Sequence, residues 1–145
     1  MNVGGDPFVI EYNVRMGDPE TEVVIPRIES DLVEVFQAIG NKKLDQVEMK
    51  ISDKTVCTVM AVSGGYPEAY ERLKPISGIE TIEESIVFHA GTTQKENEIL
   101  TNGGRVLAVS SIGDTKKEAL DKSYASLEKI SFENMYYRTD IGFDL

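Results

Sequence analysis

The sequence predicts an α+β fold. Helix-like periodicity lies in the first fifty residues and again near the end, whereas the stretch between them has strand-like periodicity. Helices and strands that are segregated along a chain favour α+β over a regularly alternating α/β arrangement. With 145 residues, of which 41% are hydrophobic, the chain is long enough for one domain with a buried core, or for two small pieces sharing a surface.

The charge balance disfavours one class of partner. There are 15 basic and 25 acidic residues, which gives a net charge of −10 and opposes binding to nucleic acid. No apolar run approaches the roughly 18 residues of a membrane span. We therefore expect no nucleic acid and no membrane as partner, and a cytoplasmic location. A small phosphorylated ligand stays compatible with this charge if a metal ion or a few arginines reverse the field locally.

The first predicted elements are a turn and a strand. A stub of three residues precedes the turn residues 4–7, and a strand is predicted over residues 8–14. A chain that starts inside a hairpin is expected to be a piece of a larger protein.

Two helices are predicted next. Asp18 and Pro19 have the form of an N-cap and first turn, and Pro26 is expected to end or kink that helix. The second helix is predicted to begin at Asp31 and to stop at Gly40. Its expected apolar stripe consists of Leu32, Val35, Phe36 and Ile39.

The middle of the chain is predicted to be rich in strands. Buried strands are expected over residues 55–62 and 85–90, and a hairpin is expected from residues 98–100 and 105–112 around an Asn-Gly turn. A covering helix follows the capping-box spacing of Thr115 and Glu118. Its expected apolar stripe consists of Leu120, Tyr124, Leu127 and Ile130.

Three polar residues on the first predicted strand form the main functional signal. Strand alternation places Glu11, Asn13 and Arg15 on one face, about 7 Å apart. Carboxylate and amide oxygens suit Mg²⁺, and a guanidinium fork suits a carboxylate or phosphate. The alternative is an ordinary solvated sheet face. The following helix start, at Gly17 to Glu20, favours the first interpretation because helix N-termini attract anions.

Other polar residues carry weaker signals. Cys57 is expected to be a buried small hydrophobe, and one cysteine with one histidine, His89, cannot supply the three or four ligands of a zinc site. Residues 101–104 with Arg105 either cradle a phosphate through turn amides or form a plain hairpin turn.

A family resemblance joins these motifs. Residues 11–21 resemble the metal-binding strand and turn of the phosphoribosylamine–glycine ligases, also called glycinamide ribonucleotide synthetases, which are ATP-grasp enzymes. The resemblance continues in the family's order through residues 24–27, 30–34, 65–67, 88–92, 101–107 and 137–142.

The resemblance implies an ATP-dependent carbon–nitrogen ligase of de novo purine biosynthesis. ATP would convert glycine to glycyl phosphate, and 5-phosphoribosylamine would displace the phosphate to give glycinamide ribonucleotide. Glu11 and Asn13 would hold the Mg²⁺ or Mn²⁺ that bridges the nucleotide phosphates. Arg15 and Asp18 would be catalytic, with a purely structural cap as the alternative for Asp18. The implied substrate-binding residues are Gly17, Glu20, His89 and Arg105.

The resemblance also implies a domain division. Residues 1–50 would be the last strand and helices of an ATP-grasp domain, and residues 51–145 a small β-rich C-terminal domain of the rudimentary hybrid-motif type. The partners would be ATP, glycine, 5-phosphoribosylamine and the N-terminal and ATP-grasp portions of the same enzyme, and the chain alone would be inactive. The alternatives are another ATP-grasp ligase or carboxylase, and a stand-alone binding or assembly module.

Overall fold

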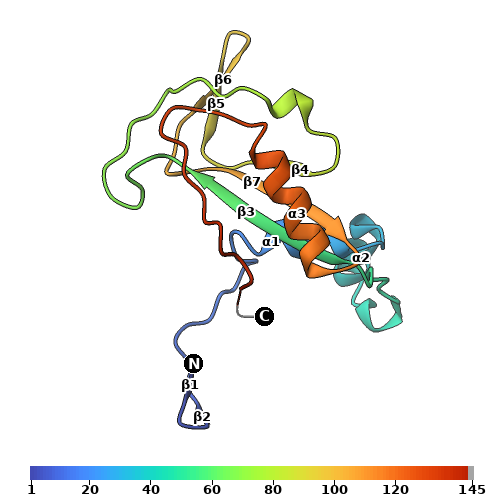
Figure 1. Cartoon of the computed structure of the whole chain (residues 1–145). Coiled ribbons are helices and arrows are strands. Elements are labelled where there is room, and N and C mark those ends of the chain that lie inside the picture. The colour runs from blue at the N-terminus through green and yellow to red at the C-terminus, as the bar shows by residue number, and fades with distance from the viewer. Residues whose placement is uncertain (144–145) are drawn as a thin grey trace.

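A three-stranded antiparallel sheet forms the centre of the molecule (Figure 1). The computed structural model describes residues 1–143. Strand β7 (Arg105–Gly113) lies between β3 (Thr55–Val62) and β4 (Ile86–His89). Helix α3 (Lys116–Leu127) packs across β3 and β7. The α+β class, the strand over residues 55–62 and the covering helix are therefore confirmed.

The remaining elements are short. Two small antiparallel sheets contain β1 (Asn2–Val3) with β2 (Asp6–Pro7), and β5 (Thr92–Lys95) with β6 (Glu98–Thr101). The other helices are α1 (Thr21–Val24) and α2 (Leu32–Gly40), with single 3₁₀ turns at Ile25–Arg27, Leu44–Gln46 and Ile79–Thr81. None of the helices within residues 1–143 is long and apolar enough to cross a membrane.

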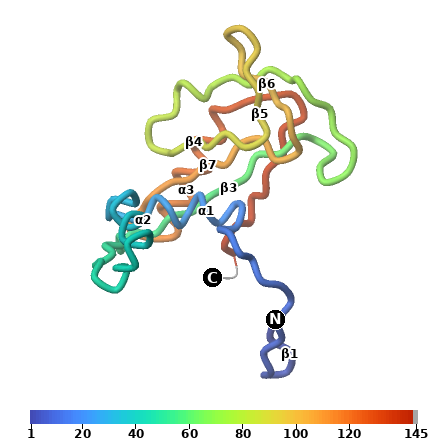
Figure 2. Tube along the Cα trace, turned by 180° about the vertical axis from the view of Figure 1, so that it is seen from behind, coloured from blue at the N-terminus to red at the C-terminus, as the bar shows by residue number. Residues whose placement is uncertain are grey.

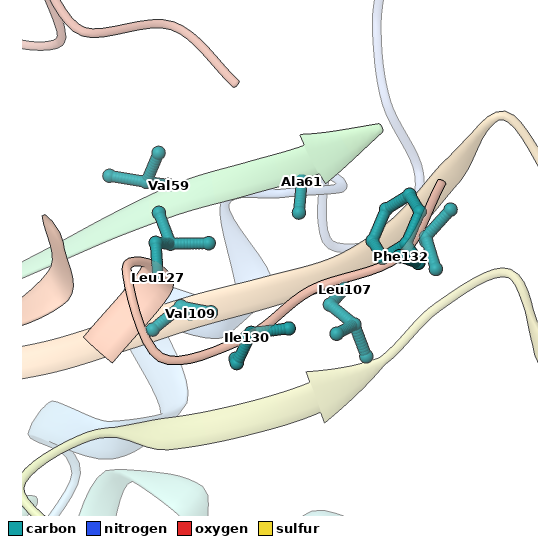
Figure 3. Packing of buried hydrophobic residues seen from close by; sticks show 8 residues of the cluster. Val59, Ala61, Leu107, Val109, Leu127, Ile130 and Phe132 are labelled. Atoms are coloured by element: carbon teal, nitrogen blue, oxygen red, sulfur yellow. The ribbon is translucent and has the colours of Figure 1, made fainter. Parts of the chain in front are cut away.

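The core lies between α3 and the sheet. Its buried members come from β3, β7, the end of α3 and the segment that follows (Figure 3), and they are Val59, Ala61, Val106, Leu107, Val109, Leu127, Ile130 and Phe132. Leu120 and Tyr124 pack against this cluster, so the predicted stripe is confirmed for Leu120, Tyr124 and Leu127, whereas the buried Ile130 lies beyond the end of the helix. Thr115 caps that helix, because its Oγ1 accepts a hydrogen bond from the Glu118 N–H at 3.2 Å.

The predicted hairpin around residues 101–104 is wrong. Strand β6 pairs with β5 rather than with β7, and the two-residue turn at Glu96 and Asn97 joins β5 to β6. Strand β7 is nine residues long and finds its partners in β3 and β4. The Asn-Gly dipeptide therefore carries the chain from one sheet to another.

The predicted strand over residues 8–14 is also wrong. The segment runs away from the body of the molecule (Figures 1 and 2), and only Phe8 makes backbone hydrogen bonds, which it shares with Met1. Val14 is 98% exposed. A strand exists only when a neighbour completes its hydrogen bonds, and no segment within residues 1–143 pairs with residues 9–14.

The first helix begins later than predicted. Helix α1 starts at Thr21, whose N–H donates to the Gly17 carbonyl at 3.0 Å, and Asp18 does not cap it. The Asp18 carboxylate instead contacts Arg105, which lies 87 positions later in the chain. Pro26 lies in the 3₁₀ turn that ends α1, as expected.

Helix α2 has its predicted bounds but not its predicted burial. The Asp31 carboxylate caps it by accepting from the Val33 N–H at 2.8 Å, and the helix ends at Gly40. Val35 is buried, whereas Phe36 and Ile39 are 63% and 51% exposed. The described residues cover Val35 but leave Phe36 and Ile39 uncovered, so α2 presents part of its apolar stripe to solvent.

We expect core truncation at Leu127 to be costly. Leu127 is fully buried in the main cluster, and Leu127→Ala removes apolar contacts and leaves a cavity, which costs about 2–5 kcal/mol of unfolding free energy. Urea unfolding measures this loss. Leu73→Ala is the matched control because Leu73 is exposed, and its loss should stay within about 0.5 kcal/mol. Equal losses would contradict the burial of Leu127 in this core.

We expect the contribution of Glu118 to the stability of the fold to depend on pH. Its carboxylate accepts from Lys122 Nζ at 2.7 Å and from the Asp114 N–H at 2.8 Å. The hydrogen bond from Lys122, and after it the one from Asp114, hold the pKa of Glu118 below its usual 4.5. A carboxyl whose pKa is lowered in the folded state stabilises the fold at pH values above its pKa in the unfolded chain. This stabilisation is lost as the pH falls through the pKa of the folded state.

The melting temperatures of wild type and Glu118→Gln should therefore differ most at neutral pH and converge as the pH falls below 4.5. Glu68→Gln, at an exposed loop position, is the control and should follow wild type throughout. A difference for Glu118→Gln that is the same at every pH would show that the carboxylate charge is not what stabilises the helix start.

Candidate functional site

Two arginines line a cleft at the end of β3. The cleft has a volume of about 290 Å³ and lies where the start of β7 meets the C-terminal segment. Its two cations are Arg105 and Arg138. The rest of the lining is chiefly apolar or aromatic, and includes Pro19, Met60, Val62, Tyr66, Tyr136 and Ile141.

Arg105 joins this cleft to the turn before α1. Its Nη2 lies 3.0 Å from Asp18 Oδ2, and its Nη1 donates to the Asp18 carbonyl, also at 3.0 Å. The guanidinium therefore makes hydrogen bonds to both the side chain and the backbone of a residue 87 positions earlier. Two of the residues predicted from sequence, Asp18 and Arg105, are thus brought together.

Arg138 is held by its own neighbours. Its Nε and Nη2 donate to the two carboxylate oxygens of Asp140 at 2.8 and 2.9 Å, and the hydrogen bond from Arg138 holds the pKa of Asp140 below its usual range. Tyr124 donates its hydroxyl to the Arg138 carbonyl at 3.1 Å. A paired backbone bridge between Val62 and Tyr136 fixes the same segment along the end of β3.

Glycines permit the close packing behind the cleft. A Cβ at Gly103 would lie 2.9 Å from the Gly91 Cα, and a Cβ at Gly104 would overlap the ring of Tyr66. Ser63 stabilises this close approach, because its hydroxyl donates to the Gly103 carbonyl and its N–H donates to the Gly104 carbonyl, each at 2.8 Å. The glycines of residues 101–104 therefore serve a close backbone approach rather than a hairpin turn.

The predicted metal ligands lie on the exposed N-terminal segment. Asn13 Nδ2 donates to Glu11 Oε1 at 3.2 Å, so these side chains lie on the same side of the backbone. Arg15 donates to the Met16 carbonyl at 3.0 Å instead of contacting either of them. No group of three metal-ligating side chains forms within residues 1–143. Two oxygen ligands fit Mg²⁺, which commonly completes its shell with water and substrate phosphates.

The other predicted substrate contacts lie apart. The Gly17 carbonyl accepts from the Thr21 N–H, and the end of the Glu20 side chain lies beside the Gly17 Cα. His89 is exposed on β4, where its Nδ1 lies 3.0 Å from Thr92 Oγ1, and it is not among the residues that line the cleft. The described structure thus places neither His89 nor Glu11 beside Arg105.

Sequence reasoning did not single out Arg138 or Tyr66 as site residues. Both lie in segments that resemble the ligase family, but neither segment carries a spacing that indicates chemistry. The signal that identifies Arg138 is its position on the same cleft as Arg105.

Residues 55–144 match the family described as "Phosphoribosylglycinamide synthetase, C domain", which covers more than half of the chain. The chain belongs to this family. The phosphoribosylamine–glycine ligase of Vibrio vulnificus (strain CMCP6) is 48% identical over 141 residues, a stretch that makes up 96% of this chain and 33% of that protein. The chain therefore spans about a third of that relative's length.

Two further relatives agree with this membership. A Pichia angusta protein named bifunctional purine biosynthetic protein PUR2,5 is 45% identical over 140 residues, which make up 95% of this chain and 18% of that protein. The crystal structure of phosphoribosylamine–glycine ligase from Thermotoga maritima matches with a TM-score of 0.76 and 38% identity. That match covers 97% of this chain and 34% of the solved chain.

We expect a small but measurable coupling between Asp18 and Arg105. Both side chains are partly exposed, so solvent screening limits their ion pair to about 0.2–1 kcal/mol. A double-mutant cycle with Asp18→Asn and Arg105→Gln, followed by urea unfolding, measures the coupling. The control cycle is Lys117 with Asp121, an ion pair within α3. Zero coupling for the first pair would show that the turn is not attached to β7 in solution.

Proposed function

We propose that the chain is the C-terminal part of a phosphoribosylamine–glycine ligase. The observation that carries the proposal is the extent of the match. A relative of that name aligns with 96% of the chain, well beyond the C-domain segment at residues 55–144. The aligned stretch leaves two thirds of that relative without a counterpart here. We infer that the ATP-binding lysine and lid lie in that portion, and that the chain alone does not turn over.

The proposed reaction activates a carboxylate. Glycine takes the γ-phosphoryl group of ATP to form glycyl phosphate and ADP. The amine of 5-phosphoribosylamine then attacks the carbonyl carbon and expels phosphate, which gives glycinamide ribonucleotide. When bound by Glu11 and Asn13, Mg²⁺ or Mn²⁺ would neutralise charge on the nucleotide phosphates. The adjacent side chains of these residues support this ligand pair.

Arg15 would stabilise negative charge at the reacting centre. Its guanidinium is exposed and is engaged only with a backbone carbonyl of the next residue among the contacts described, so it is available to a carboxylate or phosphoryl group by a side-chain rotation. Such a role needs a fixed positive charge rather than a proton. Asp18 and Glu20 would orient the amine substrate from the neighbouring turn, with Gly17 allowing close approach.

The exposed apolar surfaces near the N-terminus support a missing neighbour. Residues 9–14 have no strand partner among the described residues, and α2 exposes Phe36 and Ile39. Apolar stripes of this kind are normally covered in a complete fold. We propose that the N-terminal and ATP-grasp portions of the same enzyme, located in the cytoplasm, cover them, so that residues 1–50 complete the ATP-grasp domain.

Expression of the complete reading frame that contains this chain tests the proposal. The purified protein should form ADP, phosphate and glycinamide ribonucleotide only when ATP, glycine, 5-phosphoribosylamine and a divalent metal are all present. Glu11→Gln should lower kcat/KM by about 100-fold or more, because a bound metal supplies several kcal/mol of transition-state stabilisation.

Glu29→Gln is the matched control, since Glu29 is an exposed carboxylate outside the proposed site, and its activity should equal that of wild type. Turnover with a different carboxylate or amine would favour another ATP-grasp ligase or carboxylase. A reading frame without a nucleotide-binding portion, and a protein without ATP consumption, would favour a stand-alone binding module.

A further inference from the structure

We propose that Asn102 is a modification site, at which the side-chain amide is converted to a carboxylate through a cyclic imide formed with the Gly103 nitrogen. An Asn-Gly dipeptide occurs once in the chain. It lies between β6 and β7 and does not form the hairpin turn of which such dipeptides are typical. The reaction involves these two residues and water, and it is independent of the proposed ligase activity.

The conversion needs neither an oxidant nor a cofactor. Hydroxide removes the proton from the Gly103 backbone nitrogen, which attacks Cγ of Asn102; a C–N bond forms, and the side-chain nitrogen leaves as ammonia. Water then opens the five-membered imide at one of its two carbonyl carbons. Opening on one side gives aspartate. Opening on the other side gives isoaspartate, in which the main chain runs through the former side chain and is one methylene longer.

Asn102 meets the three structural requirements of this reaction. It is exposed, and its side chain makes no hydrogen bond within residues 1–143, so it can rotate toward the backbone. The Gly103 N–H likewise donates to no group in that part of the chain, so no acceptor holds the attacking nitrogen. Glycine also has no Cβ to hinder the attack, and it has the widest choice of backbone angles.

Two other exposed asparagines each lack one of these requirements. After Asn41, the Lys42 N–H donates to the Ile39 carbonyl at 3.0 Å and is therefore held by an acceptor. Asn13 precedes Val14, whose β-branched side chain crowds the attacking nitrogen. Asn41 and Asn13 are thus controls that match Asn102 in solvent exposure but not in the chemistry of the following residue.

An isoaspartate at position 102 would disturb the packing behind the cleft. The Asn102 N–H donates to the Gly91 carbonyl at 2.7 Å, and the Gly103 carbonyl accepts from the Ser63 hydroxyl at 2.8 Å. Between these two contacts the backbones are so close that a Cβ at Gly103 would lie 2.9 Å from the Gly91 Cα. An added main-chain methylene has to displace one of the contacts, whereas the aspartate product keeps the original backbone.

Mass spectrometry of the protein expressed from the complete reading frame tests the site. After incubation in mildly alkaline buffer and proteolysis, Asn102 should gain the mass of an amide-to-acid conversion about tenfold faster or more than Asn13 or Asn41, because only its neighbour is both unhindered and unbonded. Labelling by an isoaspartyl methyltransferase should detect part of the product. Asn102→Gln should suppress the conversion, since its longer side chain forms the corresponding ring less readily.

Protection by the fold would overturn the proposal. The same protein unfolded in guanidinium chloride gives the intrinsic rate of the dipeptide, and the native protein should convert Asn102 at a comparable rate. Conversion in guanidinium chloride without conversion in the native protein would show that the folded backbone keeps the Gly103 nitrogen from the side chain. The aged native protein should also melt below Asn102→Asp, and equal melting temperatures would reject the disturbance of the contact between Gly91 and Gly103.

Discussion

The pairing of β7 on both of its edges is the constraint on which the rest of the structure depends. Residues 106–111 are buried throughout; β3 pairs along one edge of this stretch, and β4 pairs with residues 107–110 along the other. Because buried backbone groups must be paired, the position of β7 fixes both neighbours. It also fixes the surface on which α3 packs, and hence the apolar core between them.

The cleft is a consequence of that arrangement. Strand β7 begins at Arg105, so its register determines where this guanidinium emerges. Just before β7, Gly103 lies close to Gly91, and Tyr66 packs against Gly104. The backbone bridge between Val62 and Tyr136 holds the C-terminal segment beside the same end of β3. Three segments that are distant in sequence, around Tyr66, Gly104 and Tyr136, thus meet at one end of β3.

Local signals in the sequence were reliable where the structure is local. Thr115 and Glu118 identified the start of α3, Asp31 and Gly40 the limits of α2, and the apolar run over residues 55–62 identified β3. The sequence-based predictions were wrong where the pairing partner of a strand, rather than the local sequence, determines the structure. An Asn-Gly dipeptide is typical of hairpins, but the partners of β7 lie on β3 and β4. Residues 8–14 alternate like a strand, yet no neighbour in residues 1–143 makes them one. Arg138 became visible only because it lines the same cleft as Arg105, which no spacing along the chain encodes.

The order in which the cleft residues occur along the chain determines when the cleft can form during synthesis of the protein on the ribosome. Pro19 comes near the beginning, Arg105 follows much later, and Tyr136, Arg138 and Ile141 lie within the final ten residues of the sequence. Protein domains fold while the ribosome adds residues from the N-terminus onward. The wall that carries Arg138 therefore leaves the exit tunnel after the strands and the helix against which it packs. A nascent chain can therefore build the sheet and dock α3 before the cleft exists.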